Sequence, residues 1–181
     1  AITVGYVAPQ LWINELMPSN SATVTDGEGE YEDWVEIFNP GDTPVDLAGY
    51  YFCDDHYDFG AGTYVMGAIP DGYPNLTTVP ANGFIIAWFD EDLAQGPLHI
   101  NTKLGSTADA VYLIAPDMIH VLDQVTYADL AGLATDVSWG RYPDGSANWT
   151  LFGVGQALPA TPGASNGSTA NQLGAGLDAA W

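Results

Sequence analysis

The stretch that decides the fold is Asp33-Trp34-Val35-Glu36-Ile37-Phe38-Asn39-Pro40. Residues 34–38 predict a β-strand, and Asn39-Pro40-Gly41-Asp42 is a strong turn signal directly after it. We expect Trp34 to fill the core, with Asp33 and Glu36 flanking it on alternate faces of the strand. Asn39 is expected to form an Asx-type turn with the two residues that follow it.

Strand signals continue on both sides of this stretch. Ile2, Val4 and Tyr6 alternate with small or polar residues, which is typical of a half-buried strand. About nine short strands, separated by turns that contain Gly or Pro, predict an all-β sandwich or barrel. Residues 92–95 and 128–133 show one-turn helical patterns, and the long irregular stretch 56–80 is of a kind that often has a function. The expected strands are residues 2–7, 11–16, 34–38, 45–52, 84–89, 110–115, 119–127, 137–142 and 149–152.

Several segments, taken in order, resemble the lamin tail domain, in the form common in secreted bacterial and archaeal proteins. The resemblance spans residues 13–166 and implies an immunoglobulin-like antiparallel β-sandwich. It also implies an interaction module, attached to nuclear filaments in animals and to secreted enzymes or surface proteins in microbes. On this basis residues 1–12 form an N-terminal extension strand, 13–166 the sandwich, and 167–181 a Gly- and Ala-rich C-terminal tail. The matching segments are residues 13–16, 33–40, 45–50, 54–55, 80–84, 98–104, 138–145 and 161–166.

The net charge is −21, with 23 acidic residues against Lys103 and Arg141. Such a protein is repelled by nucleic-acid backbones and by anionic lipid surfaces, so we expect neither as a partner. Salt or bound divalent cations must screen this charge, and adaptation to a saline environment is the favoured explanation. Arg141 is expected to pair with a carboxylate.

An extracellular or cell-surface location is expected. The chain begins at Ala1 without a signal peptide, as a secreted chain does after processing and as a trimmed chain also does. No run of 18 apolar residues exists, which argues against membrane insertion. Three sequons make glycosylation candidates of Asn75, Asn148 and Asn166.

No set of residues assembles into a catalytic mechanism. The three histidines and the single cysteine, Cys53, are scattered, and no nucleophile elbow is present. Residues 174–179 superficially fit a dinucleotide fingerprint, but they lie too close to the C-terminus for the helix and strand that the cofactor needs. We therefore expect a non-catalytic protein that requires no cofactor.

Calcium is the one candidate ligand among metal ions. Acidic residues crowd a Gly-containing loop, and a second acidic group follows residue 53. Neither group has the EF-hand spacing, because the twelfth position counted from Asp26 is Ile37. A solvated acidic loop is the favoured alternative. The candidate metal ligands are Asp26, Glu28, Glu30, Asp33, Asp54 and Asp55.

Two functions are compatible with these features. The first is self-assembly into a filament or surface layer, in which the extensions contact other copies of the chain by adding a strand to a neighbour's sheet edge. Pairing of residues 2–7 within their own sandwich is an equally good alternative. The second function is adhesion to a surface polymer, with calcium as a candidate cofactor and with aromatic residues of the 56–80 stretch, such as Tyr73, stacking on sugars. The candidate assembly residues are Ile2, Val4, Tyr6, Val7, Leu177 and Trp181.

Overall fold

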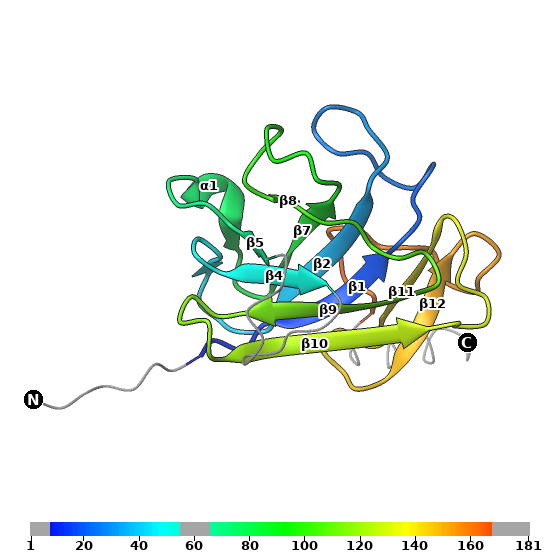
Figure 1. The fold of residues 1–181 in the computed structure, drawn as a ribbon. Coiled ribbons are helices and arrows are strands. Elements are labelled where there is room, and N and C mark those ends of the chain that lie inside the picture. The colour runs from blue at the N-terminus through cyan, green and yellow to red at the C-terminus, as the bar shows by residue number, and fades with distance from the viewer. Residues whose placement is uncertain (1–7, 55–65, 168–181) are drawn as a thin grey trace, which may run out of the picture.

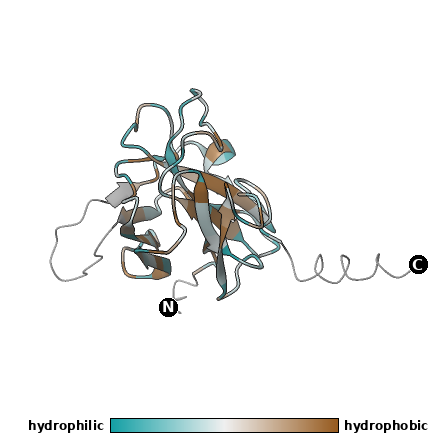
Figure 2. Cartoon of the chain, turned by 90° about the vertical axis from the view of Figure 1, so that its right-hand side faces the viewer, coloured by the Kyte–Doolittle hydropathy of each residue, from teal (hydrophilic) through white to brown (hydrophobic). Residues whose placement is uncertain are grey.

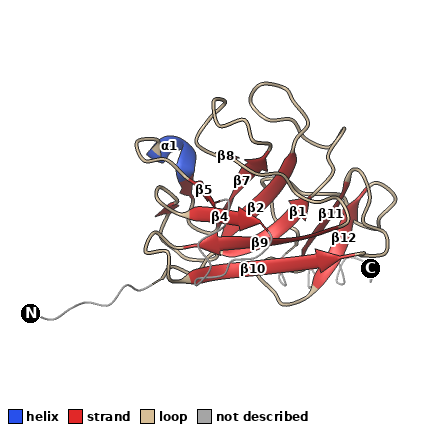
Figure 3. Ribbon diagram, viewed as in Figure 1, coloured by secondary structure: helices blue, strands red, loops and turns tan. Residues whose placement is uncertain are grey.

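The structure is a computed structural model that describes residues 8–54 and 66–167. Its strands form two layers that face each other, with long loops at one end (Figure 1), and every described pairing within the layers is antiparallel except the parallel pairing of β7 (Gly83–Phe89) with β8 (His99–Ile100). Strands dominate the described residues, and the one helix among them is a single turn (Figure 3). The predicted all-β, immunoglobulin-like sandwich is confirmed.

Six strands form the larger sheet and four form the smaller one. In spatial order the larger sheet consists of β12 (Trp149–Gly153), β11 (Val137–Arg141), β1 (Trp12–Met17), β2 (Asp33–Asn39), β7 (Gly83–Phe89) and β8 (His99–Ile100). The smaller sheet consists of β10 (Val121–Ala128), β9 (Ala108–Ile114), β4 (Tyr51–Asp54) and β5 (Met66–Ala68). A separate two-stranded ribbon and a short helix complete the set: β3 (Val45–Asp46), β6 (Thr78–Val79) and α1 (Pro74–Thr77). No helix in the described part of the chain has the length and apolar character needed to cross a membrane.

Strand β2 lies at the centre of the larger sheet, between β1 and β7. Its residues Val35 and Ile37 belong to the hydrophobic core between the two sheets. Alternation along the strand therefore directs Trp34 and Glu36 to the outer face of this sheet. Trp34 is fully buried, as expected, but it lies on that outer face beside its cross-strand neighbour Met17 and not in the main core.

The core lies between the two sheets. Phe52 of β4 and Phe89 of β7 meet across the layers in an edge-to-face contact, with ring centroids 5.5 Å apart. Val111 and Leu113 of β9 are fully buried from the side of the smaller sheet. Many residues of the strands are hydrophobic, while the loops alternate between hydrophilic and hydrophobic residues (Figure 2).

One expected strand is interrupted. Residues 45–52 do not form one strand, because β3 and β4 belong to different sheets. A turn separates them, in which the Tyr50 amide donates to the Leu47 carbonyl at 2.9 Å and Gly49 adopts a φ of 78°. Only glycine adopts this backbone conformation without a steric penalty. The stretches 92–95 and 128–133, expected to form single helical turns, are not helical: Ala128 ends β10, and the remaining residues form turns and irregular loop.

Candidate functional site

Polar residues of the motif segments converge on the outer face of the larger sheet. We call Asn14, Glu15, Glu36, Ser138, Asp144, Thr161 and Asn166 the outer polar cluster. The Asn14 amide donates to Glu36 Oε1 at 2.9 Å and to Asp144 Oδ1 at 3.0 Å. Thr161 donates its hydroxyl to Glu15 Oε2 at 2.8 Å. The cluster thus joins β1 and β2 to loops more than 100 residues away in the sequence.

The cluster fastens residues 154–167, which we call the closing segment, onto the sheet. The backbone amide of Gly163 donates to Glu36 Oε2 at 2.7 Å, and that of Asn166 donates to Asp144 Oδ1 at 2.8 Å. Gly140 makes the approach possible, because a Cβ atom there would lie 2.8 Å from Asn166 Nδ2. These contacts give the motif residues a structural role.

Burial in the cluster raises the pKa of its two glutamates, Glu15 and Glu36. Burial raises the pKa of Glu15 above its ordinary value, against hydrogen bonds from Ser138 and Thr161 that lower it. Burial raises the pKa of Glu36 well above its ordinary value, and the nearby Glu15 adds to the effect. Proton uptake therefore limits the electrostatic cost of burying these acids together.

Arg141 pairs with a carboxylate, as expected. Its Nη2 lies 2.9 Å from Asp123 Oδ2, and both side chains are about nine-tenths buried. Its guanidinium also donates to the carbonyls of Ile13 and Ser146 and lies against the rings of Trp12 and Trp149, 4.9 and 4.7 Å from their centroids. The expected Asx-type turn is likewise confirmed by the hydrogen bond of 2.9 Å from the Gly41 amide to Asn39 Oδ1.

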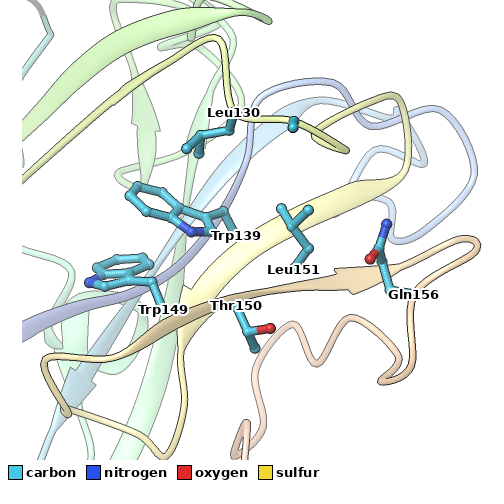
Figure 4. A pocket seen from close by; sticks show the side chains of 7 residues that line it. Leu130, Trp139, Trp149, Thr150, Leu151 and Gln156 are labelled. Atoms are coloured by element: carbon cyan, nitrogen blue, oxygen red, sulfur yellow. The ribbon is translucent and has the colours of Figure 1, made fainter.

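A pocket opens beside β11 and β12, at one edge of the sandwich. Trp139 and Trp149 lie side by side in it, with ring centroids 4.4 Å apart and planes tilted by 33° (Figure 4). Both indoles are half-buried, so part of each ring system is open to solvent. We call this site the tryptophan pocket, and it is lined by Leu130, Ala131, Trp139, Trp149, Thr150, Leu151 and Gln156.

The candidate calcium ligands are not brought together as a set. Glu28 and Glu30 are exposed, whereas Asp26 is buried in the loop between β1 and β2. Asp33 begins β2 in the larger sheet, and burial raises its pKa to about 7. Asp54 ends β4 in the smaller sheet, and Asp55 lies outside the described residues.

Asp26 meets two residues that the sequence did not single out. One carboxylate oxygen of Asp26, one of Asp90 and one ring nitrogen of His99 lie within 4.8 Å of one another. Asp90 follows β7 directly, and the end of β7 pairs with the start of β2, where the acidic loop ends. The sequence shows an acidic residue, Asp90, at the end of an expected strand. It does not show that this strand pairs with β2, which is what brings Asp90 close to Asp26.

The glycosylation candidates differ in exposure. Asn75 and Asn148 are exposed, whereas Asn166 is buried and its Nδ2 donates to the Arg141 carbonyl at 3.1 Å. Tyr73, the stacking candidate in the described part of the 56–80 stretch, is 49% exposed. The predicted assembly residues lie outside the described residues: Ile2, Val4, Tyr6, Val7, Leu177 and Trp181.

Comparison with known families agrees with this architecture. Residues 6–129 match the family described as Lamin Tail Domain. Among curated proteins, none is similar enough to count as a match. The family match ends before the closing segment, yet the outer polar cluster joins that segment to β1 and β2 inside the matched range. The chain belongs to the lamin tail domain family, whose members are non-catalytic immunoglobulin-like domains.

Proposed function

We propose that this chain is a non-catalytic extracellular or cell-surface module that recognises a neutral surface polymer, with a saccharide as the ligand class. The observation that carries the proposal is the tryptophan pocket, in which two half-buried indoles lie side by side at the edge of the sandwich. Tryptophan combines a large apolar face with a polar N–H group, which makes it effective at wet binding surfaces.

The shape of the fold supports an accessible site there. Trp139 and Trp149 lie on β11 and β12, the two strands at one edge of the larger sheet, and part of each indole is exposed. Trp139 and Leu151 are cross-strand neighbours on β11 and β12, and Trp149 lies on the same face by alternation. The pocket has a volume of about 310 Å³, which is within the range of small-ligand sites.

The chemistry of the lining supports a saccharide. The negatively charged faces of the indole rings attract the weakly positive C–H groups of a sugar ring. Thr150 and Gln156 offer a hydroxyl and an amide for hydrogen bonds in the same pocket. The pocket thus combines apolar side chains with polar groups, as specific ligand sites do.

Charge supports a neutral ligand and a binding role. A net charge of −21 repels acidic polymers. The seven residues of the lining include no titratable side chain, so the pocket itself supplies no general acid or base. Binding without catalysis is the activity that such a lining favours.

Binding to insoluble neutral polysaccharides, such as cellulose, chitin and amylose, tests the proposal in a depletion assay. Trp149→Ala should weaken binding by about 2 kcal/mol, roughly 30-fold, as expected for a tryptophan hot spot. Because Trp149 also stacks on Arg141, a second variant, Gln156→Ala, removes a lining group that makes no such contact. Trp88→Ala, at the opposite side of the larger sheet, is the matched control. Equal binding by all four proteins, or none by the wild type, would reject the saccharide site.

Self-assembly remains a second candidate because of a long sheet edge. Strand β10 has eight residues and, among the described strands, pairs only with β9. An edge strand of this length offers a row of backbone groups to which a strand from another copy can add. The extension at residues 2–7, which has the alternation of a strand, is the proposed partner.

A further inference from the structure

A second site, independent of the tryptophan pocket, lies between two loops at the opposite end of β2 from Asn39. The first loop, residues 18–32, joins β1 to β2, and the second, residues 90–98, joins β7 to β8. Both loops rise together at the top of the molecule in Figure 1. Asp26 comes from the first loop, Asp90 from the second, and His99 from the start of β8.

Asp26 is held in a fixed orientation by its own loop. Its Oδ1 accepts the backbone amides of Glu28 and Glu30, each at 2.9 Å. The Asp26 amide in turn donates to the Glu30 carbonyl at 3.0 Å. The loop therefore folds around this side chain and supplies its amides to Oδ1 alone.

Oδ2 of Asp26 is buried and has no hydrogen-bond partner within the described residues. The whole side chain is deeply buried, since Asp26 is only 8% exposed. Buried carboxylate oxygens are almost always paired, because an unpaired one has lost its water without compensation. This orphaned oxygen is the feature that calls for a ligand.

Asp90 and His99 supply the other two donors. Asp90 Oδ1 accepts the Asp92 amide at 2.9 Å, which leaves Oδ2 facing His99 Nδ1 at 2.5 Å. Both residues are buried, at 3% and 8% exposure. Nδ1 of the imidazole contacts Asp90, and neither ring nitrogen makes a hydrogen bond to Asp26 Oδ2.

The surrounding charge favours a cation. The negative charges of Asp90, Glu30 and Asp92 repel the Glu32 carboxylate, and the positive charge of Lys103 attracts it. Several acidic groups are thus gathered around the three donors, and a divalent ion there would reduce their mutual repulsion.

We propose that Asp26, Asp90 and His99 bind one divalent transition-metal ion, with water in the open position. Two carboxylate oxygens and one imidazole nitrogen suit Zn²⁺ and related ions better than Ca²⁺, which takes six to eight oxygen ligands. The ion joins the loops 18–32 and 90–98 and so orders that end of the sandwich. Gln95 already connects the loops, since its Nε2 donates to Glu30 Oε2 at 2.7 Å.

Zinc titration of the full chain, stripped of metal with EDTA, tests this site by calorimetry. The wild type should bind one Zn²⁺, and Asp26→Asn and His99→Gln should each weaken binding at least about tenfold. Asn at position 26 keeps an oxygen for the amides of Glu28 and Glu30, so this variant should stay folded. The controls are Glu28→Gln and His120→Gln, which remove an exposed carboxylate from the same loop and an exposed imidazole elsewhere.

Two further measurements distinguish a built site from diffuse attraction to an acidic surface. A free zinc concentration about 100-fold above Kd should raise the Tm of the wild type by about 5 to 10 °C. The ¹⁵N NMR signals of the His99 imidazole should shift with one equivalent of Zn²⁺, which a purely structural His99 would not show. Equal zinc affinity in all five proteins, or saturable calcium binding with no zinc binding, would overturn the proposal.

Discussion

Replacing Arg141 with Met should be among the most destabilising single substitutions in this chain. The guanidinium connects β11 to three other parts of the fold: β1 through the Ile13 carbonyl, β10 through Asp123, and the turn at Ser146. Met has a similar length and can fill the space between the indoles of Trp12 and Trp149. The substitution therefore removes the charge and the donors while leaving only a small cavity.

The magnitude follows from what the missing side chain leaves behind. Removing one partner of a buried ion pair costs about 3–5 kcal/mol. Two backbone carbonyls also lose a charged donor, at about 1–3 kcal/mol each. These losses share one side chain and do not add fully, so we expect a loss of about 5 kcal/mol in the free energy of unfolding. Arg141→Lys should lose roughly half of that, because it keeps the charge but not the planar set of donors.

Urea unfolding, followed by tryptophan fluorescence at fixed salt, measures this difference. Lys103→Met is the matched control, because it removes the other cation from an exposed site and should cost less than about 1 kcal/mol. Burial already raises the pKa of Asp123 against the effect of Arg141, and losing the cation raises it further. A carboxyl whose pKa is raised in the folded state lowers the free energy of unfolding as pH rises. The loss in the free energy of unfolding caused by Arg141→Met should therefore be smaller at pH 5 than at pH 8. A loss below about 1 kcal/mol at both pH values would refute the role assigned to this pair.

Three other outcomes are expected. Burial raises the pKa of Asp33 to about 7, so the native state binds more protons than the unfolded chain between about pH 4 and 7. The free energy of unfolding should therefore fall as pH rises through that window. Asp33→Asn should flatten this pH dependence and, at pH 8, raise the free energy of unfolding by about 2 kcal/mol in denaturant titrations. Deleting residues 1–8 should reduce oligomer size in light scattering if the N-terminal extension contacts another copy, and an unchanged size would remove the assembly proposal. When the chain is expressed in a glycosylating host, mass spectrometry should find glycans at the exposed Asn75 and Asn148 but not at Asn166, whose buried amide already donates two hydrogen bonds.

Most strands could be predicted from local pattern. The turn signal at 39–42 marks the end of β2, and Pro116-Asp117 marks the hairpin between β9 and β10, because Pro, Asn, Asp and Gly restrict or permit particular backbone angles within a few residues. The Asx-type turn at Asn39 is equally local. Patterns of this kind need no knowledge of the rest of the chain, so the sequence was sufficient for them.

The sheet face on which a side chain lies could not be predicted without knowing the tertiary contacts. Trp34 is as apolar as any core residue, but alternation places it on the outer face of the larger sheet, the face on which the closing segment, 120 or more residues later, bonds to Glu36. Residues 45–52 look like a single strand until Gly49 places β4 in the other sheet. Asp90 and His99 meet Asp26 only because β7 lies beside β2. None of these long-range contacts is encoded in a local pattern.

The way in which this chain accommodates buried carboxylates argues for the proposed metal site. Asp123 has a cation, Arg141, and Glu15 and Glu36 have raised pKa values, so protons neutralise them more readily. Burial also acts to raise the pKa of Asp136, but hydrogen bonds from residues 21–23 outweigh it and hold the pKa at about 2.

The second oxygen of Asp26 has no hydrogen-bond partner within the described residues. Its loop supplies two amides to Oδ1 and nothing to Oδ2. Of the two basic residues in the chain, Arg141 pairs with Asp123 and Lys103 lies near Glu32 and Asp33, and neither gives Asp26 Oδ2 a hydrogen bond. A protein this acidic must obtain positive charge from solution, and Asp26, Asp90 and His99 form the place in the described structure where three buried donors converge to receive it.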